Sequence, residues 1–354
     1  MDTCVGIHAV ALYLPPVVRH NDWWPGHIVA SWRNQRRPPP PARPLSPGEL
    51  RVAAAMCEQA ADPFQSAVAR HVMPPDMTVL DMAEQAGRAA IARAGVAGSD
   101  IDLLLTSIAL PDVLLGNPAC ELHHRLGLPR RCFALETSAA TYSFLMQLTL
   151  AQAMIATGSA RLALLVQACG VTHLVDREDP ISPLFGDGAT AVVVGPVSDG
   201  RGIRAAAHHA DGRFPNTLVA SVRGGRWYDA GRGEIHVADP VQMRDVFLAT
   251  ADICKESIDA VLAKSGLTTR DVGFFAMHQG TPWIHRVIQD HAGLGHARSI
   301  ESFSRTGYLF ASTIPAGLAL ADGAGLLADD DLVLATAGGP GVTFGSIAMR
   351  WGSR

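Results

Sequence analysis

The sequence predicts an α/β fold made of two similar halves, and three observations support that prediction. The chain has 354 residues, which exceeds the usual length of a single domain. Short apolar runs alternate along it with Ala- and Leu-rich stretches of helical pattern, as is typical of α/β proteins. Two of the apolar runs also recur about 170 residues further along the chain, which indicates an internal repeat.

Each expected strand is a short apolar run bounded by polar or turn-forming residues. Such runs are typical of strands that helices bury on both faces of a sheet. The first strand is expected in the N-terminal stretch MDTCVGIHAVALYLPP, which lacks the basic start and the cleavage site of a targeting peptide. Five further strands are expected at Ile101–Leu110, Ala160–Gly170, Gly188–Gly195, Val272–Gly280 and Asp331–Gly339.

The internal repeat is visible in two pairs of segments. SDIDLLLT at Ser99–Thr106 parallels RDVGFFAM at Arg270–Met277, and SARLALLVQACGV at Ser159–Val171 parallels DDLVLATAGGPGV at Asp330–Val342. A solenoid would repeat every 20 to 50 residues or so, roughly a quarter of this spacing or less. The repeat therefore indicates one α/β half that has been duplicated.

Composition and charge argue against several classes of protein. An apolar fraction of 48% with 18% charged residues indicates a folded globular protein. The net charge of −4, with one short basic cluster at Arg33–Arg37, gives no support for nucleic acid as a partner. The six cysteines lack C-x-x-C spacing, which argues against a metal site and fits a reducing compartment. No apolar run reaches the roughly 18 residues of a membrane span. We therefore expect a cytoplasmic protein that binds neither membrane nor metal.

Two segments are expected to be exposed loops. The stretch Trp32–Arg51, WRNQRRPPPPARPLSPGELR, is so rich in Pro and Arg that regular structure should break there, and we interpret it as an insertion at about 33–50. A solvated insertion is favoured over a peptide-docking role. The glycine-rich stretch Arg223–Gly233, RGGRWYDAGRG, is expected to be a loop that covers the mouth of an active site.

Five motifs resemble those of one enzyme family. They are ALETSAATYSF, LFGDGATAVVVG, HHADG, FFAMHQG and the C-terminal GGPGVTFGSIAMRW. In order and spacing, from about Thr78 to Trp351, they resemble the motifs of 3-oxoacyl-acyl-carrier-protein synthase III (KAS III) and its acyltransferase relatives in the thiolase superfamily. Each motif alone is weakly specific, whereas the ordered set is highly specific.

The resemblance implies a thiolase-like, five-layered αβαβα fold of two duplicated halves, which agrees with the repeat. It places the N-terminal half at residues 1–196, including the Pro-rich insertion, and the C-terminal half at residues 197–354. It also implies a homodimer whose substrate is an acyl thioester of CoA or of an acyl carrier protein, with no further cofactor.

The resemblance also assigns candidate site residues. In the family, a Cys at the N-terminus of a buried helix becomes acylated, and a His and an Asn of the second half promote decarboxylative condensation. At the matching positions this chain has Thr141 for the Cys, His278 for the His and Tyr308 for the Asn. A helix N-terminus directs N–H groups at such a nucleophile. The resemblance therefore implies an oxyanion hole made by the backbone N–H groups of Thr141 and Gly341.

The threonine at position 141 leaves two interpretations open. An alcohol ionises far less readily than a thiol, whose reference pKa is about 8.5, and a helix dipole worth about 1 kcal/mol cannot close that gap. Thr141 would need a general base, which His278 could supply. Otherwise Thr141 only caps the helix and lines a pocket. Three cysteines elsewhere in the chain, Cys120, Cys132 and Cys169, are expected to be small buried hydrophobic residues and not a replacement nucleophile.

The tyrosine at position 308 is open in the same way. The Tyr308 phenol can donate one hydrogen bond to a carbonyl or orient His278, or it can simply fill space. Loss of the amide donor of Asn disfavours carbon–carbon condensation.

The sequence therefore predicts an acyltransferase that moves an acyl group from a CoA or carrier-protein thioester to an oxygen or nitrogen acceptor, in a specialised-metabolite pathway of polyketide type. His278 would either activate Thr141 for a covalent acyl-Thr intermediate or deprotonate the acceptor directly. Two alternatives stay open. One is a non-catalytic subunit that forms a heterodimer with a Cys-containing paralogue, and the other is an ordinary decarboxylative 3-oxoacyl synthase.

Overall fold

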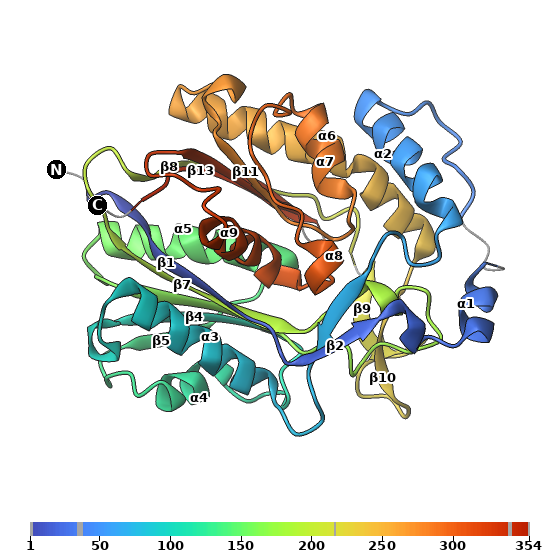
Figure 1. Ribbon diagram of the computed structural model, residues 1–354, viewed down its shortest axis with the longest axis horizontal. Coiled ribbons are helices and arrows are strands. Elements are labelled where there is room, and N and C mark those ends of the chain that lie inside the picture. Colours follow the sequence, from blue (N-terminus) through green and yellow to red (C-terminus); the bar gives the residue numbers. More distant parts are fainter. Residues whose placement is uncertain (1–2, 34–37, 216, 339–341, 353–354) are drawn as a thin grey trace.

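Two β-sheets and three layers of helices make up the fold (Figure 1). The computed structural model describes residues 3–33, 38–215, 217–338 and 342–352. The layers alternate, from outer helices through the first sheet, the central helices and the second sheet to the outer helices of the second half. This confirms the predicted α/β fold with its five αβαβα layers.

The first sheet has the strand order β1, β7, β6, β4, β5. β7 pairs antiparallel with both β1 and β6, whereas β4 pairs parallel with both β6 and β5. Helices cover both faces, and β4, β6 and β7 are accordingly buried along almost their whole length. The strands are Val5–Tyr13 (β1), Leu103–Ala109 (β4), Phe133–Glu136 (β5), Ala163–Cys169 (β6) and Gly188–Pro196 (β7).

The second sheet repeats this arrangement with the order β8, β13, β12, β11. β13 pairs antiparallel with both β8 and β12, and β12 pairs parallel with β11. Position by position these strands match β1, β7, β6 and β4, which confirms the duplication seen in the sequence. The strands are Gly202–Ala210 (β8), Phe274–Met277 (β11), Leu332–Gly338 (β12) and Thr343–Arg350 (β13). The boundary between the halves at residue 196 stays a prediction.

Helices pack on the outer faces of both sheets and between them. α3 (Val79–Ala94) and α4 (Pro118–Arg125) cover the first sheet, and α6 (Pro240–Ser265), with α7 (Ile284–His291) beside it, covers the second. Between the sheets lie α5 (Ser143–Ala156) and α9 (Thr313–Gly323). Both are apolar around most of their circumference, as is typical of helices buried on all sides. Among the described residues, no helix is long and apolar enough to cross a membrane.

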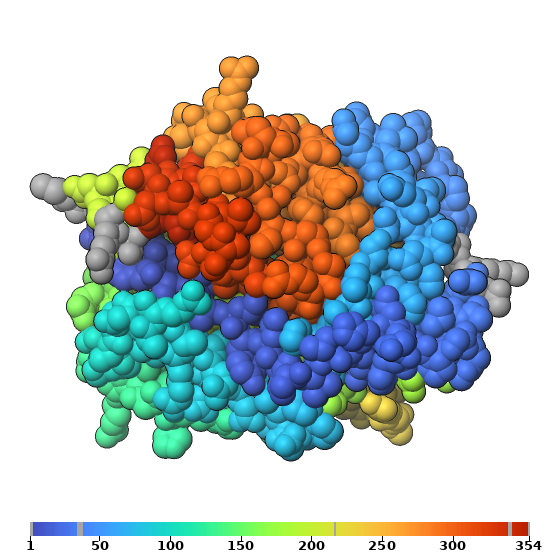
Figure 2. Space-filling model, in the orientation of Figure 1, coloured from blue at the N-terminus to red at the C-terminus, as the bar shows by residue number. Residues whose placement is uncertain are grey.

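The Pro-rich segment is a loop only in part, because α2 (Pro47–Glu58) begins inside it. The expectation of an exposed loop at Trp32–Arg51 is therefore wrong at both ends, because Trp32 is the buried last residue of α1 (Gly26–Trp32) and α2 includes the residues from Pro47 on. Residues 34–37 lie outside the described part of the chain. Ser46 and Glu49 form a capping box that starts the helix, with proline at the first helical position. α2 packs against α6 and α7, so this N-terminal segment, blue in Figure 2, lies on the orange second half.

Short elements complete the fold. A two-stranded sheet pairs β9 with β10, and the glycine-rich loop expected at Arg223–Gly233 connects these two strands. A second one pairs β2 with β3. The bounds are Val17–His20 (β2), Ala69–Val72 (β3), Leu218–Val222 (β9), Gly233–Val237 (β10), Gly26–Trp32 (α1) and Phe303–Thr306 (α8).

Candidate active site

Thr141 lies at the entrance to the central helix α5. It belongs to a 3₁₀ turn, Ala140–Tyr142, that leads directly into α5. Ala140 has a φ of +48°, an uncommon conformation for a residue with a side chain. The Thr141 side chain is 2% exposed, and its hydroxyl donates a hydrogen bond of 2.6 Å to the carbonyl oxygen of Gly338. The hydroxyl proton of Thr141 is therefore directed at the main chain of β12.

Tyr308 lies just before the equivalent turn of the other central helix. It precedes the 3₁₀ turn Phe310–Ser312 that leads into α9, and Phe310 has a φ of +49°, matching Ala140. The Tyr308 main chain is fixed by two hydrogen bonds, one from its N–H to Leu184 O of 2.7 Å and one from Gly186 N–H to its carbonyl of 3.2 Å. The duplicated fold thus presents Thr141 and Tyr308 on equivalent turns of its two halves.

His278, directly after β11, lies beside Tyr308. Its N–H donates to Thr336 O of β12 at 3.0 Å, which fixes the residue where the strand ends. Its ring nitrogen Nε2 lies 3.3 Å from the Tyr308 hydroxyl. Although the ring keeps some exposed surface, it lies deep in the protein, and the loss of solvation lowers the pKa of His278 to about 4. The imidazole is therefore neutral at physiological pH.

The Tyr308 phenol is held rigidly and stays protonated. Its ring stacks on Phe310 with a centroid distance of 4.6 Å and contacts Phe185 at 5.7 Å. Burial raises the pKa of Tyr308 well above its usual value, with the nearby Cys169 adding to the shift and a hydrogen bond with Thr141 opposing it. Both groups are neutral, so the Tyr308 hydroxyl and His278 Nε2 share one hydrogen bond whose direction is set by the tautomer of the imidazole.

The structure therefore brings all three predicted side chains together. Tyr308 lies within hydrogen-bonding reach of both His278 and Thr141. Gly341, the second predicted oxyanion donor, lies outside the described residues. The roles of these residues in a reaction stay predictions.

A narrow cavity of about 120 Å³ opens onto His278 and Tyr308. A water molecule occupies about 30 Å³ of liquid, so the space corresponds to about four waters, well below the usual 300–1,000 Å³ of pockets for larger ligands. α6 supplies one wall, with residues such as Met243 and Phe247. The lining residues are Thr217, Leu218, Met243, Val246, Phe247, Thr250, Ile253, Cys254, Met277, His278, Gly280, Ile284, Tyr308, Gly338 and Val342. This lining suits a slender, largely apolar chain.

The buried polar atoms that lack hydrogen-bond partners among the described residues include three on chain neighbours of the residues that line this cavity. They are Gln242 Oε1, Thr281 Oγ1 and Trp283 Nε1. Each belongs to a residue that adjoins a cavity-lining residue in the chain. Gln242 precedes Met243, Thr281 follows Gly280, and Trp283 precedes Ile284. Unpaired buried polar groups are rare and need an explanation, such as a bound ligand or water. The sequence analysis missed all three. Thr281 and Trp283 lie close to His278 in the chain, but no motif marks Gln242.

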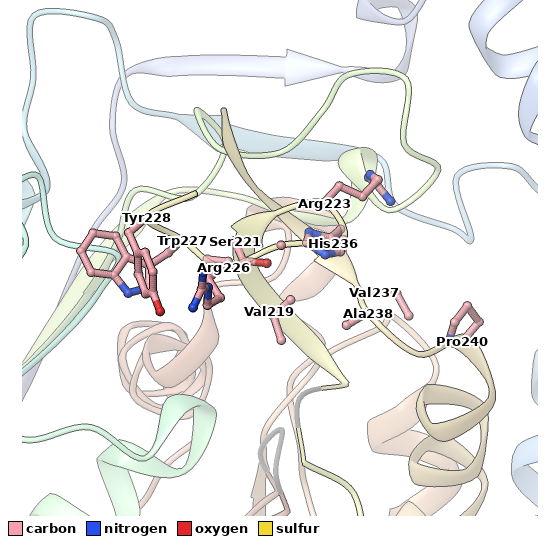
Figure 3. A pocket seen from close by; sticks show the side chains of 13 residues that line it. Val219, Ser221, Arg223, Arg226, Trp227, Tyr228, His236, Val237, Ala238 and Pro240 are labelled. Carbon is pink, nitrogen blue, oxygen red and sulfur yellow. The ribbon is translucent and has the colours of Figure 1, made fainter. Parts of the chain in front are cut away.

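The glycine-rich loop lines a different pocket, of about 670 Å³, on the outside of the β9–β10 hairpin (Figure 3). Trp227 and Tyr228 pack edge to face there with a centroid distance of 5.4 Å, and the Arg226 guanidinium lies 4.5 Å from the centre of the Tyr228 ring. None of the residues 223–233 lines the inner cavity, which the same hairpin reaches through Leu218. The expectation that this loop covers the mouth of the cavity beside His278 is therefore wrong for the described residues.

The cysteines supply no activated thiol near Thr141. Cys132 and Cys169 are buried as expected, and burial raises the pKa of Cys132 to about 11 and that of Cys169 well above its usual value. Cys120 is exposed. The expectation of burial is wrong for this residue because the short helix α4 turns Ala119 and Leu122 to the core instead.

Among the residues that the structure describes, the site combines one neutral base with donors and contains no activated nucleophile. The hydroxyl of Thr141 faces a carbonyl, and the base His278 faces Tyr308, so the pair needed to ionise Thr141 is not formed. The Tyr308 O–H and the Thr141 N–H at the helix entrance are donors of the kind that stabilise a developing oxyanion. This arrangement suits the binding and polarisation of a carbonyl better than the formation of an alkoxide.

Comparison with known proteins identifies relatives over both halves of the chain. Residues 135–212 match the family model of 3-oxoacyl-[acyl-carrier-protein (ACP)] synthase III, and residues 262–351 match the model of the C-terminal part of the same enzyme. The β-ketoacyl-[acyl-carrier-protein] synthase III of Geobacillus kaustophilus is 35% identical over 286 residues, which cover 80% of this chain and 86% of that protein. The enzyme of the same description from Alkalilimnicola ehrlichii is 32% identical over 283 residues, covering 80% of this chain and 87% of the relative.

Solved structures agree with the fold described above. The crystal structure of 3-oxoacyl-(acyl carrier protein) synthase III from Pseudomonas aeruginosa superposes with a TM-score of 0.79 at 25% identity, covering 98% of each chain. The priming β-ketosynthase of the R1128 polyketide biosynthetic pathway superposes with a TM-score of 0.80 at 23% identity, covering 100% of this chain and 98% of the other. Because its identity is only 23%, the likeness to the priming β-ketosynthase is one of fold alone.

Proposed function

Because the chain belongs to the 3-oxoacyl-acyl-carrier-protein synthase III family of the thiolase superfamily, we propose that it uses an acyl thioester and passes the acyl group directly to an oxygen or nitrogen acceptor. No acyl-Thr intermediate forms in this proposal. The observation that carries it is the pair of hydrogen bonds at the site. Thr141 Oγ1 donates to Gly338 O, while His278 Nε2 faces the Tyr308 hydroxyl. The base thus bonds to Tyr308, while the threonine hydroxyl bonds to a carbonyl, and His278 also lines the cavity.

The cavity supports a thioester as the donor. The thiol arm of CoA and of a carrier protein alternates short methylene chains with two amide groups. A narrow apolar passage beside α6 fits the methylene parts. Gln242 Oε1 and Trp283 Nε1, an acceptor and a donor without partners on chain neighbours of lining residues, are of the kinds that pair with an amide N–H and C=O.

The proposed reaction uses the three side chains in distinct roles. The thioester carbonyl accepts hydrogen bonds from the Thr141 N–H and from the Tyr308 O–H, which turns from His278 to the carbonyl. His278 Nε2, freed from Tyr308, takes the proton of the acceptor as its oxygen or nitrogen bonds to the carbonyl carbon. The C–S bond then breaks, and the departing thiolate receives that proton. No charge has to develop on Thr141 Oγ1.

The family's usual reaction is disfavoured at this site. By the resemblance, carbon–carbon condensation relies on an acylated Cys and an Asn, and this chain has Thr141 and Tyr308 at those positions. We extend the proposal to a specialised-metabolite pathway of polyketide type, because a chain changed at both positions is unsuited to the condensation step of fatty-acid synthesis.

The proposal is tested by assaying the purified protein with acetyl-, butyryl- and malonyl-CoA, and with the matching acyl carrier proteins, against a panel of alcohols and amines. We expect release of free thiol that depends on the acceptor, with the acylated acceptor identified by mass spectrometry. His278→Ala should abolish the release. A matched control is His236→Ala, since His236 is a buried histidine of the β9–β10 hairpin that does not line the inner cavity. Thiol release that needs no acceptor and yields a 3-oxoacyl product would contradict the proposal.

A second candidate function is a non-catalytic partner subunit. Two observations favour it, the unactivated hydroxyl of Thr141 and the exposure of three consecutive apolar side chains. Val113, Leu114 and Leu115 are 70%, 54% and 105% exposed, as is typical of a surface that a partner covers. This function predicts that the protein alone releases no thiol and raises the kcat of a Cys-containing paralogue on mixing. Size-exclusion chromatography with light scattering distinguishes that heterodimer from a homodimer of this chain.

A further inference from the structure

A buried network of polar side chains lies behind the two turns that carry Thr141 and Tyr308. Gln147 of α5 and Gln167 of β6 are both fully buried, in segments whose other buried residues are mostly apolar. Gln167 shares the face of β6 that carries Ala163 and Leu165, which pack in the central core. An apolar side chain at either position would fit that pattern, so the two amides call for an explanation.

Every side-chain nitrogen and oxygen of the two glutamines has a hydrogen-bond partner. Gln147 Nε2 donates to Thr137 Oγ1 at 3.0 Å, and Gln167 Nε2 donates to Gln147 Oε1 at 2.5 Å. Gln167 Oε1 accepts from Thr190 Oγ1 at 2.9 Å, and the Gln167 carbonyl accepts from Ser312 Oγ at 3.0 Å. A satisfied buried network of this kind fixes one arrangement of the segments that contribute to it, whereas apolar contacts allow several.

The segments that this network joins are the two turns of the site. Thr137 begins the turn that leads through Ala140 to Thr141, and its hydroxyl also donates to Thr106 O at 3.0 Å. Ser312 ends the other turn, which follows Tyr308. Gln167 connects to both turns, to the first through its side chain and Gln147, and to the second through its main-chain carbonyl, which any residue at position 167 would offer to Ser312. The two glutamine side chains therefore hold the first turn to β6, and the main chain of β6 holds the second.

Both turns need such a restraint. Ala140 and Phe310 have φ values of +48° and +49°, a conformation that persists in residues with side chains only where the surroundings enforce it. Thr141 follows the first of these residues, and Tyr308 lies two positions before the second. A small relaxation of either turn would therefore move the Thr141 N–H relative to the Tyr308 O–H.

We propose that Gln147 and Gln167 are positioning residues that set the separation between the two carbonyl-binding donors, the Thr141 N–H and the Tyr308 O–H. This inference rests on the proposed function for its kinetic consequence. A displacement of about 1 Å at such donors lowers rates by up to roughly 100-fold without weakening the binding of remote parts of a substrate. Neither glutamine lines the cavity, and their side-chain hydrogen bonds run to each other, to Thr137 and to Thr190.

The test uses an apolar version of the network, the triple variant Gln147→Leu, Gln167→Leu, Thr190→Val. The variant removes both partners of the bonds between the two glutamines and between Gln167 and Thr190, and Thr137 Oγ1, which loses the Gln147 amide, still donates to Thr106 O. It should therefore fold with a melting temperature near that of the wild type. We expect kcat for acyl transfer to fall roughly 10- to 100-fold while KM for the thioester stays nearly constant. The single variant Thr190→Val, which keeps both glutamines, should have a kcat near that of the wild type.

A matched control is Gln289→Leu. Gln289 is a buried glutamine of α7 that donates to the main chain at Leu294 and Ala297, away from both turns. This variant should lose stability and keep its kcat. An unchanged kcat in the triple variant, or a kcat that falls equally in Gln289→Leu, would overturn the positioning role.

A second measurement separates this inference from the proposed function. If the wild type transfers no acyl group to any acceptor, the proposed function fails, and crystal structures of the wild type and of the triple variant then test the network alone. We expect the turn at Ala140–Thr141 and the turn at Tyr308–Phe310 to shift relative to each other in the triple variant. Turns that superpose in the two structures would overturn the inference.

Discussion

Removal of the single phenolic oxygen of Tyr308 is the sharpest perturbation that the site allows. Tyr308→Phe keeps the ring, and with it the stack on Phe310 at 4.6 Å and the contact with Phe185 at 5.7 Å. The variant loses the hydrogen bond to His278 Nε2, which at 3.3 Å is longer than a typical O–H hydrogen bond. Any change in activity can therefore be attributed to the hydroxyl.

The expected effects on stability and on catalysis differ greatly in size. A long hydrogen bond of this kind contributes at most about 1 kcal/mol to stability. An unfolding entropy of about 2 cal/mol/K per residue over the whole chain converts that into a melting-temperature shift of about 1 °C. If the Tyr308 O–H stabilises the oxyanion, its loss should lower kcat by roughly 100- to 1,000-fold. KM for the thioester should change little, because the cavity walls formed by α6 are untouched.

The assay is acceptor-dependent thiol release with the acylated product quantified by mass spectrometry, alongside thermal unfolding. Tyr142→Phe is the control. Tyr142 is a second buried tyrosine whose hydroxyl contacts a histidine, His208, and it does not line the cavity. That control should retain most of the wild-type kcat. If Tyr308→Phe also retains the full kcat, Tyr308 only fills space and the assignment of its O–H as a donor is refuted.

Two further predictions concern pH and packing. Burial lowers the pKa of His278 from its usual value to about 4, so the unfolded chain binds a proton that the folded chain does not between pH 6.5 and 4. The free energy of unfolding should therefore fall on acidification through that window, by at most about 3 kcal/mol, and urea unfolding should show a smaller fall in His278→Gln. A Cβ at Gly186 would lie 1.9 Å from Thr306 O, so Gly186→Ala should cost about 1–3 kcal/mol by the same measurement. Gly212→Ala, where the added Cβ meets no atom within 4 Å, should cost much less, and equal losses in the two variants would contradict the packing argument.

The strands were the most predictable part of the fold, for a physical reason. β4, β6, β7, β11 and β12 are buried on both faces, so their sequences are nearly continuous apolar runs that are hard to mistake. Helix α2 was not predicted, because the Pro-rich composition around it indicated a loop. Its capping box, from Ser46 to Glu49, was nevertheless present in the sequence as a start signal.

The site could be predicted as a set of residues but not as a geometry. The order of the motifs was sufficient to predict that Thr141, His278 and Tyr308 lie together. The direction of each hydroxyl depends on partners from distant segments, since Thr141 meets Gly338 of β12. The Gln147 and Gln167 network was also out of reach. In the sequence, Gln147 only interrupts an apolar run, and nothing there indicates which polar groups it would meet.

Intact-protein mass spectrometry during turnover is the most direct test of direct acyl transfer. The wild type and Thr141→Val are each measured with an acyl thioester and its acceptor. Valine keeps the shape of the side chain and the backbone N–H but removes the hydroxyl that faces Gly338. We expect no acyl adduct on the wild type and a kcat that is largely retained in the variant. An acyl adduct that maps to Thr141, together with loss of turnover in Thr141→Val, would contradict direct transfer.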